Sequence, residues 1–152
     1  MRKPTAVFIE TPRESDVKCE LTKDGKWEVR PIDFGLTFPF AYGFIPNSWA
    51  ADGDEADAVV FTHSRASAQL VYPLHLGRLQ MLDNGVVDDK ELFAMPGYNV
   101  TGIELEAMKF FFRNYKAGVQ VGGIIHSASS GEADSPSVLP TGEWQEIERL
   151  AF

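Results

Sequence analysis

The chain has 152 residues, and its 44% hydrophobic and 24% charged residues are ordinary values for a globular protein. It carries 14 Lys and Arg against 22 Asp and Glu, and the resulting charge of −8 argues against a nucleic-acid-binding or anionic-membrane-binding surface. Cys19 is the single cysteine, which excludes an internal disulfide framework and indicates a reducing compartment. No signal peptide and no membrane-spanning run stands out. We therefore expect one cytoplasmic domain over residues 1–152.

The first third of the chain predicts short strands. Residues 5–10 form a first apolar run. Residues 17–21 alternate apolar and polar side chains, which is the period of a strand with two unlike faces. Asp24-Gly25 then suits a hairpin turn, and residues 27–32 return as the partner strand.

The middle of the chain continues in the same way, with Pro, Gly and Asp-rich turns between apolar runs. We expect further strands at residues 58–62, 70–72, 74–82 and 91–95. Gly77 lies inside the third of these and predicts a bulge, where the strand bends to close a barrel.

One main helix is predicted towards the end. Thr101 and Glu104 have the spacing of a capping box, apolar residues follow at helical spacing, and Gly118 suits a stop after Lys116. Residues 127–142 are predicted to be a loop or mobile segment, and Trp144, Ile147 and Leu150 to lie on a short amphipathic closing helix. The sum is a small closed or nearly closed β-barrel with one main helix.

The most informative run for function is Asp52-Gly53-Asp54-Glu55-Ala56-Asp57, directly before an apolar strand. Crowded carboxylates repel one another by several kcal/mol, roughly 4 at 4 Å near the surface, unless a positive group lies among them. A solvated acidic turn is the plain interpretation, and a site for hard divalent cations is the sharper one. An EF-hand loop is excluded by Ala56, Asp57 and His63, which occupy positions that need other residues.

A second acidic run, residues 83–90, lies between two predicted strands and includes Asp83, Asp88 and Lys90. Alone it is an ordinary hairpin turn. Together with the first run it could complete a coordination sphere built from several strand ends, as in magnesium enzymes that act on phosphates.

Basic and phenolic residues accompany the acids. Lys18 and Glu20 share one face of their strand, and Arg30 comes from the partner strand. Tyr42 precedes the first acidic run, and Tyr115-Lys116 ends the helix. Each could be an ordinary surface group, whose ion pairs contribute only about 0–1 kcal/mol, but that interpretation weakens when the acids and bases are considered as one constellation.

The sequence resembles the family I soluble inorganic pyrophosphatases, over about residues 5–118. Residues 52–58 look like the family signature of Asp, small, Asp, Pro or Glu, apolar, Asp, apolar. The other similar stretches are Ile9-Glu10-Thr11-Pro12, Lys18-Cys19-Glu20, Arg30 with Phe38-Pro39-Phe40-Ala41-Tyr42-Gly43, Met81 through Pro96, and Phe111-Phe112-Arg113-Asn114-Tyr115-Lys116. Phe38 stands where the family commonly has Tyr, and Ala41 replaces a usually polar residue.

The resemblance implies a β-dominated α+β fold: a five-stranded, OB-like closed barrel flanked by helices. It implies hydrolysis of inorganic pyrophosphate to two phosphates by metal-activated water. Several Mg²⁺ ions would be held by Asp52, Asp57, Asp83 and Asp88, with Glu10 and Glu20 helping. The phosphate oxygens would be bound by Lys18, Arg30, Tyr42, Lys90, Tyr115 and Lys116. Asp54 would act as the general base, with Asp88 as the alternative.

Two other functions remain open from the sequence. One is a hydrolase of other phosphoanhydrides, and the other is a non-catalytic module, either an oligonucleotide-binding barrel or a pyrophosphate sensor. The negative charge opposes the oligonucleotide interpretation, because such barrels need a basic, aromatic face. The family likeness also suggests a homo-oligomer, a hexamer if the protein is bacterial.

Overall fold

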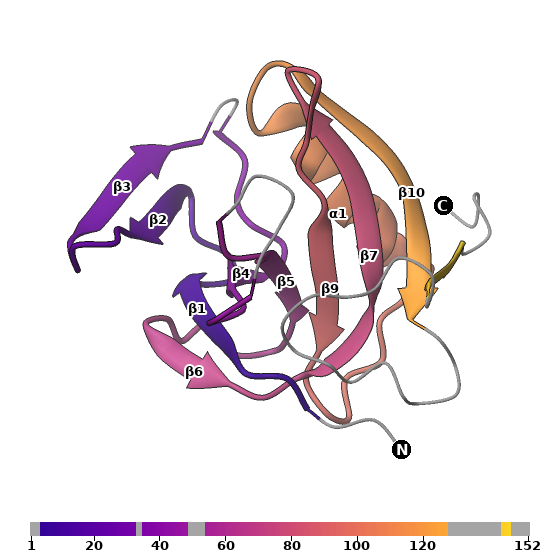
Figure 1. Cartoon of the computed structure of the whole chain (residues 1–152), viewed down its shortest axis with the longest axis horizontal. Helices are drawn as coiled ribbons and strands as arrows, with labels where there is room; N and C mark the ends of the chain where they lie inside the picture. Colours follow the sequence, from indigo (N-terminus) through magenta and orange to yellow (C-terminus); the bar gives the residue numbers. More distant parts are fainter. Residues whose placement is uncertain (1–3, 33–34, 49–53, 128–143, 147–152) are drawn as a thin grey trace.

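The computed structural model describes residues 4–32, 35–48, 54–127 and 144–146 (Figure 1). Nine strands form one sheet, in the order β11-β10-β7-β9-β5-β4-β1-β6 with β8 paired to β7. Their bounds are β1 Val7–Thr11, β4 Ala41–Phe44, β5 Asp57–Phe61, β6 Gln69–Val71, β7 Leu74–Asp83, β8 Val86–Val87, β9 Lys90–Ala94, β10 Val119–Ser127 and β11 Trp144–Glu146. Strands β2, Val17–Leu21, and β3, Trp27–Pro31, form a separate hairpin, and α1 spans Gly102–Asn114.

The prediction of a β-dominated fold with one main helix is confirmed. Within the described residues, the strand pairing runs as an open path, with β11 at one end and β6 at the other. Closure of a five-stranded barrel is therefore not part of the observed pairing. No helix in the described ranges has the length and apolarity needed to cross a membrane.

Most strand predictions agree with the structure to within one or two residues, but four elements differ. Strands β4 and β10 were not predicted, since Gly43, Gly122 and Gly123 interrupt their apolar patterns. Strand β8 was not predicted either, since its two residues lie within the second acidic run, which was interpreted as a turn. The closing helix predicted from Trp144 is wrong at its start: residues 144–146 form β11, which pairs with the end of β10. The rest of that prediction, residues 147–152, and most of the predicted loop lie outside the described residues.

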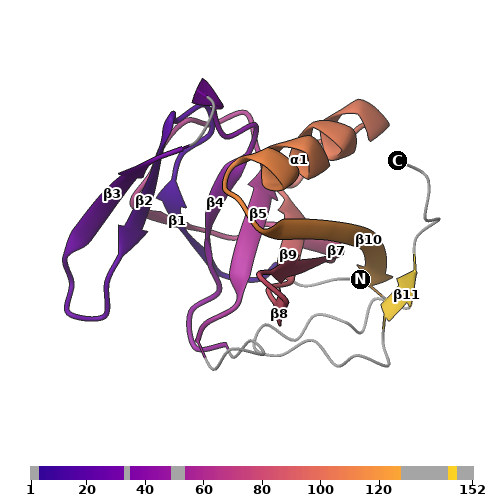
Figure 2. The same ribbon diagram turned by 90° about the horizontal axis from the view of Figure 1, so that it is seen from above.

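Two apolar clusters lie on opposite faces of the sheet, and β5 contributes alternate residues to each. Val59 and Phe61 face α1, while Ala58 and Val60 face the other side. The period of two explains this division. On the α1 side the cluster includes Leu92 of β9, and Figure 2 shows α1 lying across that face while the β2–β3 hairpin projects at one side.

Helix α1 begins as its sequence predicts. The Thr101 side chain accepts a hydrogen bond from the Glu104 backbone N–H, and the Glu104 carboxylate accepts one from the Thr101 N–H. Met108, Phe111 and Phe112 form the buried stripe that packs on the sheet. The helix ends at Asn114, and Gly118 follows with φ +86°, a left-handed conformation that favours glycine. The turn brings Lys116 to the end of β7, where it forms an ion pair with Asp83.

The predicted bulge at Gly77 is present. His75 pairs with Phe93 and Gly77 with Leu92, so β7 carries one extra residue, Leu76, against β9. A Cβ at Gly77 would lie 2.4 Å from the carbonyl oxygen of Ile125 in β10. The missing side chain therefore allows β10 to approach the bulge closely.

Candidate active site

The site lies where the α1-facing cluster reaches one end of the sheet. Asp57 shares its face of β5 with Val59, Lys90 shares its face of β9 with Leu92, and both strands run parallel with Asp57 opposite Lys90. The sequence changes there from apolar to charged side chains. The core therefore positions the charged groups at its rim.

Lys90 is the centre of this rim. Its Nζ lies 2.9 Å from Asp57 Oδ2 and 3.0 Å from each carboxylate oxygen of Asp88, and the residue is only 2% exposed. Burial alone lowers the pKa of Lys90. The carboxylates of Asp57 and Asp88, which accept hydrogen bonds from the ammonium, outweigh burial, and the pKa is raised well above its usual value. Lys90 is therefore a permanent cation between two carboxylates.

The rings of two tyrosines, Tyr42 and Tyr115, lie close to the lysine ammonium groups of the site. The Lys90 ammonium lies 5.4 Å from the ring centroid of Tyr42, and Lys18 lies 5.7 Å from the same ring and 6.0 Å from that of Tyr115. These are cation–π distances. Burial raises the pKa of both phenols, so each hydroxyl keeps its proton and can donate to an anion.

The β2–β3 hairpin contributes the next group of charges. Lys18 and Arg30 are opposite each other in the ladder, and both contact Glu20 on the same face: Lys18 Nζ at 3.6 Å, and Arg30 through its guanidinium. Burial lowers the pKa of Lys18. The predicted Lys18, Glu20 and Arg30 set is therefore brought together by the strand alternation.

Glu10, from β1, lies behind this hairpin. Its Oε2 accepts a hydrogen bond of 2.8 Å from the backbone N–H of Leu21, while burial raises its pKa to about 7. The nearby carboxylates of Glu20 and Asp57 act in the same direction, and their repulsion adds to the effect of burial.

This shift predicts a pH dependence of stability. Glu10 binds a proton more tightly in the folded state, so its contribution is complete below pH 4.5 and is lost as the pH rises through about 7. Without metal, the free energy of unfolding of the wild type should fall between pH 5 and pH 8 by on the order of 1 kcal/mol more than that of Glu10→Gln, after allowance for solvent screening. Urea unfolding with a chelator measures this. Glu28→Gln, an exposed change on β3, is the control, and parallel pH profiles for wild type and Glu10→Gln would contradict the prediction.

The second acidic turn meets the end of α1. Asp83 is at the end of β7, and its Oδ2 lies 2.5 Å from Lys116 Nζ. Its Oδ1 accepts a 3.1 Å hydrogen bond from the side-chain amide of Asn84. The backbone N–H of Asn84 donates to the Gly118 carbonyl at 2.8 Å. Asn84 was not singled out from the sequence. The Asn84-Gly85 pair, a common turn signal, was the available clue.

Asp88 is the more buried of the two candidate bases. Burial raises its pKa, although Lys90 opposes that shift. Asp54 is 60% exposed on its side chain and forms a 3.3 Å ion pair with Lys23, at the tip of the hairpin. Asp52 lies outside the described residues, so its predicted place in the cluster is not tested.

The donor set fits a hard divalent cation. Asp57 and Asp88 both contact one ammonium group, so their oxygens are close enough to share a cation, and carboxylate oxygens are the ligands Mg²⁺ prefers. In the part of the chain that is described, no three His, Cys, Asp or Glu side chains are grouped to hold a metal ion. Asp52, which would supply a further carboxylate, is not included in that part.

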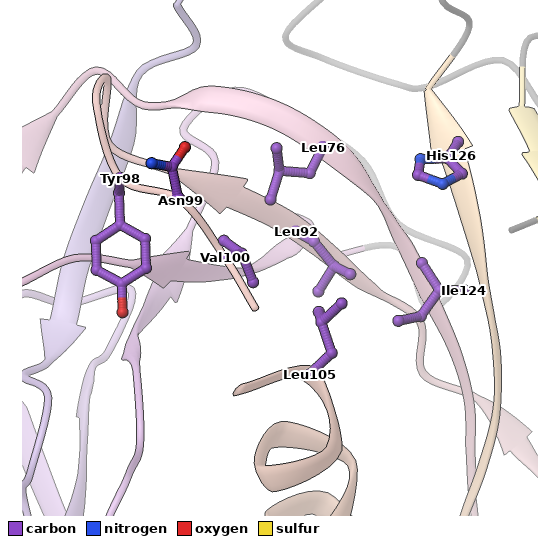
Figure 3. A pocket seen from close by; sticks show the side chains of 8 residues that line it. All are labelled: Leu76, Leu92, Tyr98, Asn99, Val100, Leu105, Ile124 and His126. Carbon is purple, nitrogen blue, oxygen red and sulfur yellow. The ribbon is translucent and has the colours of Figure 1, made fainter. Parts of the chain in front are cut away.

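A separate hollow of about 410 Å³ lies between the start of α1 and the sheet (Figure 3). Its lining is mostly aliphatic and holds no Asp, Glu, Lys or Arg; it consists of Leu76, Leu92, Val100, Leu105 and Ile124, with Tyr98, Asn99 and His126. An apolar lining of this kind does not suit a phosphate, so the charged rim is the candidate active site.

The family model described as inorganic pyrophosphatase matches residues 7–130. The chain belongs to the inorganic pyrophosphatase family. It is 33% identical to the inorganic pyrophosphatase of Synechocystis over 123 residues, covering 72% of this chain and 73% of that protein. It is 40% identical to that of Gluconobacter oxydans over 87 residues, but there it spans only 50% of the relative's length.

Solved structures of the pyrophosphatase family agree with the fold. The enzyme from Coxiella burnetii superposes with a TM-score of 0.72 at 28% identity, covering 78% of this chain and 83% of that one. The enzyme from Thermus thermophilus gives a TM-score of 0.73 at 27% identity, covering 78% and 80%.

Proposed function

We propose that the chain hydrolyses inorganic pyrophosphate to two phosphates by metal-activated water attack. Family membership supports the activity, and the observation that carries the site is the buried Lys90 ammonium between Asp57 and Asp88, bordered by Tyr42 and Tyr115. Pyrophosphate is a polyanion, and these groups provide a fixed cation and two protonated phenols. An acidic protein thereby gains a local site for an anion.

Mg²⁺ is the proposed cofactor, with several ions in the site. The proposed ligands are Asp52, Asp57, Asp83 and Asp88, with Glu10 and Glu20 at the rim. Bound Mg²⁺ would lower the pKa of a coordinated water, so that hydroxide forms near neutral pH.

The chain's own residues would bind and orient the substrate. Lys18, Lys90 and Lys116 supply point charges, while the planar Arg30 guanidinium can hold two phosphate oxygens at once. Tyr42 and Tyr115 would donate hydrogen bonds from their hydroxyls. Phe38, at the position where the resemblance expects Tyr, is buried with its ring 4.5 Å from that of Phe111, and it supplies no hydroxyl.

Phosphate release from pyrophosphate tests the proposal. Turnover should require Mg²⁺ and stop with a chelator, and a panel of nucleotide and polyphosphate anhydrides separates a pyrophosphatase from a broader hydrolase. Tight pyrophosphate binding without turnover would instead favour a binding module. Absence of any metal-dependent release would refute the proposed activity.

Asp54 is the first candidate for the general base. Asp54→Asn is expected to lose most turnover, by roughly 100-fold or more, while the protein stays folded, because the exposed side chain adds little to stability. Phosphate-release kinetics and a thermal melt measure the two effects. Asp88→Asn is the matched comparison. Unchanged activity in Asp54→Asn would transfer the role to Asp88, whose burial already raises its pKa.

We also propose one OB-like barrel domain over residues 1–152, in the cytoplasm and assembled as a homo-oligomer. The single cysteine supports a reducing compartment. Ile103 and Phe110 support assembly: they are 82% and 57% exposed, one heptad apart on α1, so they share a helix face. Light scattering gives the oligomeric state directly.

A further inference from the structure

A second charged cluster lies on the face of the β7–β9 pair opposite Lys90. Glu91 follows Lys90 in β9, so its side chain points away from the site. Its Oε1 lies 3.1 Å from His75 Nε2, and its Oε2 accepts a 2.8 Å hydrogen bond from Arg78 Nε. Glu91 and His75 are buried, and the Arg78 side chain is largely so. None of these residues has a role in the proposed mechanism.

The two partners of Glu91 lie on either side of the bulge in β7. Arg78 pairs with Glu91 in the ladder, and His75 pairs with Phe93, with the extra residue Leu76 between them. One carboxylate therefore reaches across the irregular part of the strand and contacts both flanks. Figure 1 shows β7 and β9 side by side over this length.

The register held here decides where the site residues lie. Asp83 is at the far end of β7, whereas Lys90 begins β9 and Asp88 lies two residues before it. A slip by one residue would move Asp83 by about 3.3 Å along the strand and turn its side chain to the other face. The carboxylates of the two strands would then no longer face a common centre.

A second set of contacts also holds β7 and the start of β9 in register. Asp89 Oδ1 accepts a 3.0 Å hydrogen bond from the backbone N–H of Met81. The carbonyl of Met81 in turn accepts a 2.9 Å hydrogen bond from the backbone N–H of Asp88. The turn before β9 is thus attached to β7 by a backbone and a side-chain bond at one residue.

We propose that Glu91 is a positioning residue, which fixes the β7–β9 register through His75 and Arg78 and so sets the distance between the Asp83 and Asp88 carboxylates. The consequence for metal binding rests on the proposed function of these aspartates. Residues behind metal ligands commonly change metal affinity 10–100-fold when they are replaced.

The test separates positioning from simple stability. In Glu91→Leu, the largely buried Arg78 loses its ion pair with Glu91, so both the thermal midpoint and Mn²⁺ affinity should fall, the affinity about tenfold. Arg78→Met/Glu91→Leu removes both members of the ion pair, so the midpoint should recover in part while Mn²⁺ affinity stays low. Glu91→Gln keeps the side-chain length and a carbonyl acceptor for Arg78, and its affinity should be close to wild type. Electron paramagnetic resonance titration with Mn²⁺ measures affinity without turnover.

Two outcomes overturn the proposal: unchanged Mn²⁺ affinity in Glu91→Leu, or recovery of both midpoint and affinity in the double variant. The Mg²⁺ concentration for half-maximal phosphate release should rise in parallel with the loss of Mn²⁺ affinity. Suppose that the wild type binds Mn²⁺ and the variants differ from it in Mn²⁺ affinity as expected, but the wild type releases no phosphate. That result would refute the proposed activity and leave the positioning role intact.

Discussion

Replacement of Lys90 with methionine is expected to reduce pyrophosphate turnover at least about 100-fold, because a preorganised cation at the reacting phosphate is lost. The metal-free protein should also lose about 2 kcal/mol of stability. Removing one partner of a buried ion pair costs more, about 3–5 kcal/mol, but Asp57 and Asp88 keep 39% and 21% of their side-chain surface, so water screens part of the repulsion.

Kinetics and urea unfolding with a chelator measure both effects of Lys90→Met. Lys26→Met, an exposed change on the hairpin turn, is the control and should stay within about 0.5 kcal/mol of wild type. Added Mg²⁺ should recover part of the lost stability, since a cation again lies between the carboxylates, without recovering the rate. Full turnover in Lys90→Met would show that the buried ammonium does not act on the substrate.

Gly43→Ala is expected to give the largest loss of stability in the fold, more than about 3 kcal/mol. A Cβ at Gly43 would lie 1.8 Å from the carbonyl oxygen of Phe8, so β1 and β4 would have to separate. Even ordinary overpacking costs about 1–3 kcal/mol, and here the obstacle is backbone. Because Tyr42 precedes Gly43, turnover should fall as well.

Gly102→Ala is the matched control, since it makes the same change in a different setting. A Cβ at Gly102 meets nothing within 4 Å, and the residue opens α1, where alanine is the better helix former by up to about 1 kcal/mol. Differential scanning calorimetry should therefore show midpoint shifts of opposite sign. Equal stability of the two variants would contradict the close approach of β1 and β4.

The sequence predicted those parts of the fold that depend on local patterns. The Thr101–Glu104 capping box, the Asp24-Gly25 turn and the Gly77 bulge are all present, because each is determined by residues close together in the chain. Strand β10 was missed since paired glycines break its apolar alternation, and β11 was misassigned since a few apolar residues fit either period.

The site was predictable in its residues but not in its contacts. Alternation places Lys18, Glu20 and Arg30 on one hairpin face, as observed. The pairing of Lys90 with Asp57 depends on a parallel neighbour separated by three intervening strands, and sequence spacing carries no signal for it. The His75–Glu91–Arg78 cluster was missed for the same reason.

The parallel alignment of β5 and β9 has a consequence for how the protein acquires activity. The chain between β5 and β9 contains β6, β7 and β8, so the two ends of the rim meet through contacts distant in sequence. Contacts of this kind carry a high loop-closure entropy and make refolding slow, on the order of milliseconds to seconds. After dilution from denaturant, helical signal from α1 should return before Lys90 is sequestered, and catalytic competence should appear only with the last, slowest phase.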